Sequence, residues 1–348
     1  MILLKKRQTK IILAMAAALF CILAQGVYAL AALERELVPM GNAVGIQMYT
    51  DGVLVVGLAA TEKGEAASPA AVAGILPGDL ITAVGTKRIR NAEDFRALVS
   101  ELRDEEITIT VSRGKETLKL KLRPNYNDAV PEMGLWLRDS ISGIGTLTFY
   151  DPETKLYGAL GHGVNDISAG VIMPMGRGEI YRASILEVRK GSPGQPGELY
   201  GVFDTNGVYG NINLNTDSGI FGKLETNLPS KDEAIPVAKN DDIVLGEAWI
   251  RSNVNGRAVE EFEVEITRVY RGETEGRTLM LSIKDQRLLD KTGGIVQGMS
   301  GSPIIQNGKL IGAVTHVLVH DPTKGFGVSI ENMLRESESA DVLPENAA

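Results

Sequence analysis

The feature that most constrains the fold of this chain is a series of short β-prone segments between Gly134 and about Leu334. Each segment ends at a turn signal, and examples are "GIGTLTFY", "EIYRASILEV", "FEVEITRVY", "TLMLSI" and "KLIGAVTHVLVH". Within this region, no helical pattern longer than two turns precedes Ile330. About ten such strands predict an all-β sandwich or barrel, and they disfavour a doubly wound α/β enzyme.

The preceding region, residues 39–124, has a mixed pattern. Two β-rich segments flank a predicted turn at Thr50-Asp51-Gly52, and Leu80–Val84 is a further predicted strand. Asn91 is placed to cap a helix, and alternating apolar residues predict a hairpin around Arg113-Gly114. The stretch "AAVAGILPGDLITAVGTKRIRNAEDF" resembles a PDZ domain of the kind found in bacterial proteases. This resemblance implies a carboxylate-binding loop for a peptide terminus at Ala43 to Ile46, so the predicted binding residues are Val44, Gly45 and Ile46.

The amino terminus carries a long apolar run, Ile11 to Leu33, behind a cluster of basic residues. The run exceeds the roughly 20 residues that a membrane-spanning helix needs. The basic cluster predicts that this end stays in the cytoplasm and that the chain from Glu34 onward is translocated. Val27-Tyr28-Ala29 also suits signal peptidase, so both an uncleaved anchor and an exported, cleaved form are compatible with the sequence.

The composition excludes several classes of function. A net charge of −8 and an aromatic content of 5% provide neither a basic surface nor stacking platforms for nucleic acid. The single cysteine, Cys21, lies in the apolar run, so the rest of the chain has no thiol nucleophile or cysteine-ligated zinc. Only His162, His316 and His320 can supply imidazole chemistry. The spacing of His316 and His320 predicts one strand face, which is typical of a polar surface, and we predict no metal or cofactor.

The segment "GMSGSPIIQNG", residues 298–308, contains a candidate nucleophile, Ser300. It is not the G-x-S-x-G elbow of an α/β-hydrolase, because Ser302-Pro303 and then a strand follow. A serine nucleophile needs a base and a carboxylate that orients the base. His162 lies between two glycines in "YGALGHGVND". The aspartates between His162 and Ser300 do not distinguish themselves by their context, and they are Asp166, Asp204, Asp217, Asp232, Asp241, Asp242, Asp285 and Asp290.

Nearly the whole chain resembles the SpoIVB peptidase family, through "GALGHGV", "GGIVQGMSGSPIIQNGKLIGAVTHVLV" and "GFGVSIENML". These are sporulation serine proteases that join a membrane anchor, a PDZ domain and a trypsin-like β-barrel. The resemblance implies that His162 is the general base, Ser300 the nucleophile and Asp285 the orienting carboxylate, with Asp290 as its nearest rival. The turn also resembles the G-D-S-G turn of trypsin-like enzymes, which implies an oxyanion hole made by the N–H groups of Gly298 and Ser300.

The sequence therefore predicts a mainly β protein with an N-terminal transmembrane helix, a PDZ domain (α+β) and a chymotrypsin/trypsin-like double β-barrel. The expected parts are a cytoplasmic tip with a membrane anchor or signal sequence (1–36), a PDZ domain (37–125), a serine peptidase domain (130–336) and a flexible tail (337–348). The resemblance implies an extracytoplasmic endopeptidase of the forespore intermembrane space, which cleaves a membrane-bound regulator of sigma-factor processing and possesses self-cleavage activity. The alternative is a membrane-anchored PDZ adaptor, which binds a peptide or protein C-terminus and has an inactive barrel.

Overall fold

The computed structural model describes residues 35–59, 68–103, 105–127, 130–226, 229–272 and 276–341. The described elements from β2 onward belong to one compact unit, Leu37–Ala348. The predicted membrane segment, Ile11 to Leu33, lies outside the described residues. Within the described ranges, no helix is both long and apolar enough to cross a bilayer.

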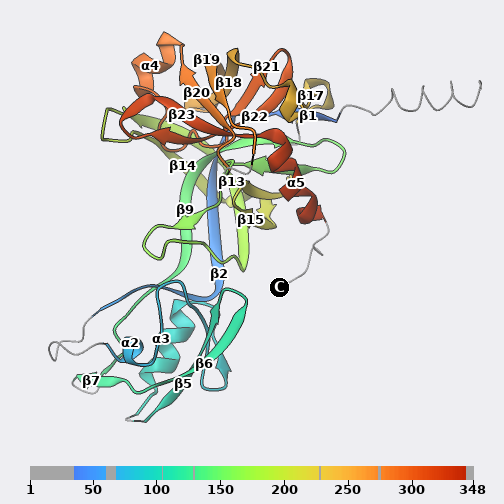
Figure 1. Ribbon diagram of the computed structural model, residues 1–348. Helices are drawn as coiled ribbons and strands as arrows, with labels where there is room; N and C mark the ends of the chain where they lie inside the picture. The colour runs from blue at the N-terminus through green and yellow to red at the C-terminus, as the bar shows by residue number, and fades with distance from the viewer. Residues whose placement is uncertain are drawn as a thin grey trace, which may run out of the picture. The chain divides into compact units, whose positions relative to one another are not determined.

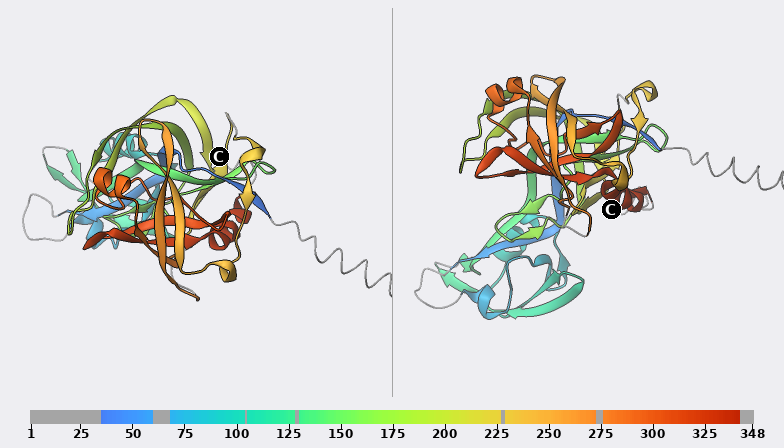
Figure 2. Two further views of the ribbon diagram at one scale, coloured as in Figure 1. Left: turned by 90° about the horizontal axis from the view of Figure 1, so that it is seen from above. Right: turned by 45° about the horizontal axis from the view of Figure 1, so that its top comes forward.

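A closed six-stranded barrel occupies the C-terminal part of the chain (Figure 1). Its strands, in spatial order, are β18 (Gly246–Asn255), β19 (Ala258–Val269), β20 (Leu279–Ile283), β23 (Asp321–Ser329), β22 (Lys309–Leu318) and β21 (Pro303–Gln306). Along β19, Phe262, Val264 and Ile266 are buried, which is the period-two pattern of a strand with one face in a core. These orange and red strands lie together in both views of Figure 2. The prediction of a mainly β protein is confirmed.

A second group of strands encloses a separate apolar core. Its pairing order is β16 (Gly219–Lys223), β10 (Leu156–Ala159), β9 (Leu135–Tyr150), β2 (Ala43–Leu58), β13 (Arg177–Arg189) and β14 (Glu198–Ile212). A bridge between Gly210 of β14 and Leu224, directly after β16, brings the two ends of this order together. The enclosed side chains include Val44, Leu147 and Tyr157. We call this group of strands the N-terminal ring.

A small α+β unit has a third core, made by residues between Val53 and Met133. It contains α2 (Pro69–Val72), β3 (Leu80–Val84), β4 (Lys87–Arg88), α3 (Ala92–Ser100), β5 (Ile107–Arg113) and β6 (Glu116–Leu122). As predicted, Asn91 caps α3, because its side-chain oxygen accepts a hydrogen bond of 2.8 Å from the Asp94 N–H group. The predicted hairpin at Arg113-Gly114 is formed by β5 and β6.

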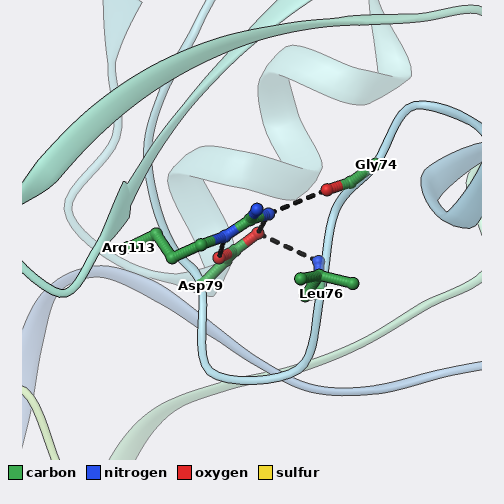
Figure 3. A network of polar contacts seen from close by, with 4 residues as sticks. All are labelled: Gly74, Leu76, Asp79 and Arg113. Atoms are coloured by element: carbon green, nitrogen blue, oxygen red, sulfur yellow. Dashed lines mark hydrogen bonds and ion pairs between the residues drawn. The ribbon is translucent and has the colours of Figure 1, made fainter.

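One buried ion pair ties this small unit together (Figure 3). The Asp79 side chain is 1% exposed, and its carboxylate accepts hydrogen bonds of 2.6 and 2.7 Å from the Arg113 guanidinium. The same carboxylate accepts a bond of 2.9 Å from the Leu76 N–H group, while Arg113 also donates to the Gly74 carbonyl at 2.8 Å. The end of β5 is thereby joined to the loop between α2 and β3.

The structure corrects the predicted turn at Thr50-Asp51-Gly52. These residues belong to β2, which continues without interruption from Ala43 to Leu58, and the pairing with β9 shifts register between Tyr49 and Leu54. The first part of β2 lies in the N-terminal ring and the last part pairs with β3 of the small unit.

The remaining elements are β1 (Glu36–Pro39), β7 (Asn125–Asn127), β8 (Val130–Glu132), β11 (Asn165–Asp166), β12 (Val171–Ile172), β15 (Leu214–Thr216), β17 (Ile235–Pro236), α4 (Gln286–Thr292) and α5 (Ile330–Asp341), with short 3-10 turns at Lys231–Glu233 and Asn240–Asp242.

Candidate active site

The turn that carries Ser300 has a conformation that requires its glycines. It lies between α4 and β21, and Gly298 and Gly301 have φ values of +96° and +97°. A Cβ atom on Gly301 would lie 2.0 Å from the carbonyl oxygen of Thr146, so no other residue fits there without a backbone shift. Met299 is completely buried between them and anchors the turn in the barrel core. The serine is therefore held on a rigid, tightly packed turn.

Two backbone N–H groups of this turn are free of acceptors. The N–H groups of Met299, Gly301 and Ser302 all donate to backbone carbonyls. Those of Gly298 and Ser300 have no acceptor among the residues that the structure describes. An oxyanion hole needs two such preorganised donors beside the nucleophile, and these are the two that the sequence predicted.

The two serines of the motif have different surroundings. The Ser300 hydroxyl is partly exposed and donates a hydrogen bond of 2.6 Å to the Thr315 carbonyl on β22. Ser302 is completely buried, and its hydroxyl pairs with that of Ser252 at 3.1 Å. Ser302 thus contributes to barrel packing, and a substrate can reach only Ser300.

His162 lies on the loop that leaves β10. Leu160 and Gly161 both adopt left-handed conformations, with φ values of 68° and 70°, and they turn the chain sharply. The Nδ1 atom of His162 lies 2.8 Å from the Gly163 carbonyl. A carbonyl only accepts hydrogen bonds, so Nδ1 carries the proton and the lone pair is on Nε2, as a general base requires. Burial lowers the pKa of the His162 imidazole, and the bond to Gly163 opposes this shift.

Thr146 of β9 joins the serine turn to the segment that leads into His162. Its N–H group donates to the Ser300 carbonyl at 3.0 Å, and its hydroxyl donates to the Gly298 carbonyl at 2.7 Å. Its own carbonyl accepts a bond of 3.1 Å from Leu160, two residues before His162. The fold therefore brings together two segments that are separated by more than 130 positions in the sequence.

The second imidazole at this place, His316, follows Thr315 on β22. The ring centroids of His162 and His316 are 4.9 Å apart and their planes are inclined by 39°. His316 is an exposed residue, but burial of part of its ring lowers its pKa to about 4, with smaller contributions from the charges of His162 and Arg277. The predicted common face with His320 is wrong, because β22 ends at Leu318 and His320 lies in the following turn.

The structure places Asp285 at the N-terminus of α4, where it caps the helix. Both carboxylate oxygens bind Arg287, and this ion pair lowers the pKa of Asp285. Within the described residues, Asp285 makes no hydrogen bond or ion pair with His162. Asp290 is exposed on α4 and accepts a hydrogen bond from Gln286. Neither of the two predicted carboxylates is therefore in contact with the imidazole.

A different carboxylate, Asp217, lies on the hairpin that packs against the His162 loop. This hairpin joins β15 to β16, and a Cβ atom on Gly163 would lie 2.8 Å from the Thr216 carbonyl. Asn215 accepts a hydrogen bond from the Val164 N–H group at 2.8 Å. Asp217 follows Thr216 at the exposed tip of the hairpin. No local pattern in the sequence favours Asp217 over the other aspartates, because the pairing of β10 with β16 is what brings its hairpin to the His162 loop.

A cleft of about 370 Å³ opens beside the serine turn. It lies between β9, β14 and the residues before Ser300, and its lining includes Gly143, Glu198, Tyr200 and Gln297. Nothing lies within 4 Å of the position of a Cβ atom on Gly143, so the β9 side of the cleft is open. The cleft can admit a side chain of an extended peptide next to the two free N–H groups.

Comparisons with known proteins agree with these features. Residues 130–334 match the family model described as SpoIVB peptidase S55. The chain belongs to this family. Residues 62–113 match a PDZ domain, so the small α+β unit of this S55 peptidase family member is a PDZ domain.

Individual relatives match only short parts of this S55 family member. A protein of Chlamydia trachomatis named "Probable periplasmic serine endoprotease DegP-like" is 37% identical over 71 residues, which are 20% of this chain and 13% of that protein. The mitochondrial serine protease HTRA2 of Bos taurus is 38% identical over 61 residues, 18% of this chain and 13% of its own. The chain thus spans about an eighth of the length of these two relatives.

Among solved structures, the active form of the Rv3671c protease from M. tuberculosis is 13% identical, with a TM-score of 0.35. The match covers 60% of this chain and 78% of that one. The HtrA-type protease AlgW, bound to a decapeptide, is 14% identical with a TM-score of 0.35, over 58% of this chain and 53% of its own. These scores are too low to carry a conclusion about the site.

The structure corrects the predicted PDZ loop. Val44, Gly45 and Ile46 lie inside β2, paired on one side with β9 and on the other with β13. A Cβ atom on Gly45 would lie 2.1 Å from the Phe203 ring, so this stretch is packed on its face as well. A peptide cannot add as a strand to a position whose two neighbours are already present.

A groove of about 360 Å³ in the PDZ domain offers a better place for a peptide. It is lined by Phe95 and Val99 of α3 and by residues Met133 to Leu137 around the start of β9. There β9 pairs with β2 on one side, and the described residues contribute no strand on its other side. The segment "MGLWL", a glycine followed by three consecutive apolar residues, is the sequence signal for this edge, and the predicted boundary at residue 125 places it outside the PDZ domain.

Proposed function

We propose that this protein is a serine endopeptidase in which Ser300 is the nucleophile and His162 the general base. One observation carries the proposal: Thr146 joins the serine turn to the His162 segment, while the N–H groups of Gly298 and Ser300 have no acceptor among the described residues. This arrangement supplies a nucleophile, a base with an available lone pair and an oxyanion site in one place. The membership in a peptidase family is consistent with it.

In the proposed reaction, the Ser300 hydroxyl turns from the Thr315 carbonyl to Nε2 of His162. His162 takes the hydroxyl proton as the serine oxygen attacks the peptide carbonyl, and the proton then passes to the leaving amine. The N–H groups of Gly298 and Ser300 bind the negatively charged oxygen of the intermediate. The loss of one such donor costs about 3 kcal/mol of barrier in comparable sites.

Two carboxylates, Asp285 and Asp217, are the candidates for orienting His162 in this mechanism. Asp285 can take that role only if it leaves Arg287, whereas Asp217 already lies on a hairpin that contacts the His162 loop. We compare Asp285→Asn with Asp217→Asn in the full chain. A carboxylate can orient His162 only if Nδ1–H turns to it from the Gly163 carbonyl, and the amide variant of that residue should then lower kcat by about four orders of magnitude. Wild-type activity of both variants would show that neither Asp285 nor Asp217 orients His162.

We further propose that the substrate is a protein in or at a membrane, and that the PDZ groove binds the C-terminus of a peptide or protein as an added strand. The family resemblance supports a role in sporulation signalling, in which a membrane-bound regulator of sigma-factor processing is cleaved outside the cytoplasm. The apolar run at Ile11 to Leu33 supports attachment to a membrane or export. Self-cleavage is part of this proposal.

The alternative is a PDZ adaptor with an inactive barrel, and the hydrogen bond from Ser300 to Thr315 instead of His162 favours it. A fluorophosphonate probe distinguishes the two, because it labels only a serine that an adjacent base activates. We expect labelling of the full chain and casein cleavage, and both are lost in Ser300→Ala and His162→Ala. Ser302→Ala is the matched control and keeps both. Full activity of Ser300→Ala would refute the mechanism, and an unlabelled wild-type chain would favour the adaptor.

A further inference from the structure

His162 and His316 approach each other from two different segments, and their distance matches that of two imidazoles on one metal ion. A Zn–N bond is about 2.0–2.1 Å long, so the metal lies about 3.2 Å from each ring centroid. At a tetrahedral angle the two centroids are then about 5.2 Å apart. The observed separation is 4.9 Å. We propose that His162 and His316 together bind a transition-metal cation such as Zn²⁺, and that the bound metal inhibits the serine centre.

The hydrogen bond of the His162 ring and the exposure of His316 suit metal binding. Nδ1 of His162 donates to the Gly163 carbonyl, an arrangement that typically fixes the tautomer and ring orientation of a zinc-ligating histidine. The lone pair of Nε2 is therefore available to the metal. The ring of His316 makes no hydrogen bond within the described part of the chain, and the residue is exposed. It can rotate about its side-chain bonds and direct a nitrogen towards His162.

The remaining coordination positions belong to water. Within the described ranges, no group of three or more histidine, cysteine, aspartate or glutamate residues is placed to hold a metal. A cation held by two side chains and water exchanges with solvent, so the inhibition is reversible. Imidazole nitrogen prefers Zn²⁺, Cu²⁺ and Ni²⁺ over Mg²⁺ and Ca²⁺, which sets the expected selectivity.

The bound metal would act directly on catalysis. It would occupy the Nε2 lone pair of His162, which the proposed mechanism needs to accept the proton of Ser300. No covalent bond forms or breaks, and removal of the metal restores the base. The inhibition arm of the test rests on the proposed function, whereas metal binding by the two histidines does not.

Removal of the Arg277 charge should strengthen zinc binding, whereas removal of either histidine should weaken it. This guanidinium lies over the Phe326 ring, 5.3 Å from its centroid, and its charge reaches His316. A nearby positive charge disfavours a divalent cation, so Arg277→Gln should tighten zinc binding by about twofold or more.

The binding test is calorimetry with ZnCl₂ on the full chain that carries Ser300→Ala, which keeps both histidines and does not need activity. We expect one zinc ion per chain. Adding His316→Gln or His162→Gln weakens binding more than about tenfold, while His320→Gln leaves it unchanged as the matched control. Unchanged zinc binding in either His316→Gln or His162→Gln, or no binding at all, would overturn the proposal.

The activity test measures the peptidase rate of each variant with zinc against its own rate without zinc. At a zinc concentration about ten times the dissociation constant, the wild-type rate should fall about tenfold and recover with EDTA. His316→Gln should lose this sensitivity and His320→Gln should retain it, while MgCl₂ should have no effect. If zinc inhibits His316→Gln as strongly as wild type, the inhibitory site is elsewhere and the proposal fails.

Discussion

The buried ion pair of the PDZ domain makes a quantitative prediction about stability. Arg113→Met keeps most of the aliphatic stem but removes two charge-assisted hydrogen bonds from Asp79, whose side chain is 1% exposed. Breaking a buried pair costs about 3–5 kcal/mol, because one charge stays in the interior without its partner. The Arg113 side chain is 35% exposed, so water replaces part of the lost interaction. We therefore expect the domain to lose about 3 kcal/mol of unfolding free energy.

Hydrogen exchange of the full chain, resolved by mass spectrometry, measures this loss locally. Amides of β3 and β5 should exchange about 100-fold faster in Arg113→Met, while amides of β19 and β22 should be unaffected. Arg88→Met is the matched control, since Arg88 pairs with Asp51 in the same region but its side chain is 68% exposed. That variant should change exchange by less than about threefold. If both variants destabilise β3 and β5 equally, the burial of Asp79 does not decide the stability of the domain.

Three further predictions concern the active site and the groove. Burial lowers the pKa of His162 from its ordinary value of 6.5, so the imidazole is still mostly neutral at pH 6.5. The acid limb of a kcat/KM profile should therefore have its midpoint below pH 6.5. A midpoint above about pH 7 would contradict this. Gly301→Ala puts a Cβ atom 2.0 Å from a backbone oxygen and should reduce activity more than about 100-fold, whereas Gly308→Ala has open space and should remain active. Trp136→Ala should weaken binding of a C-terminal peptide by about fivefold in calorimetry, while Val72→Ala, another exposed apolar residue of the PDZ domain, should not.

Local patterns in the sequence predicted the local structure well. The alternation of Phe262, Val264 and Ile266 predicted a strand of the barrel, and Asn91 predicted the start of α3. Both depend on neighbours within a few residues, where periodicity and capping act. Gly301 could be recognised as a turn residue, but the oxygen that forbids a side chain there belongs to Thr146, far away in the chain.

The errors arose where pairing between distant segments decides the structure. Nothing near Val44 indicates that β13, more than 130 positions later, covers one side of β2. The Thr50-Asp51-Gly52 stretch looks like a turn, but the pairing of β2 with β9 stops at Tyr49 and resumes at Leu54, so the strand continues through it. The contact of His162 with His316 and the position of Asp217 likewise depend on strand register, which a single sequence does not display.

The continuity of β2 and β9 has a practical consequence for domain deletion. The PDZ domain is an insertion between these two strands, since β2 enters it before Val53 and β9 leaves it after Met133. A truncation that begins after the PDZ domain would also remove β2 and leave the cores of the N-terminal ring without Val44 and Ile46. Excision that preserves the ring must instead connect Tyr49 to Ser140 through added turn residues, since these two residues are already partners across the two strands. A short β-turn there would make a protease-only chain whose cleavage preference could be compared with that of the full protein.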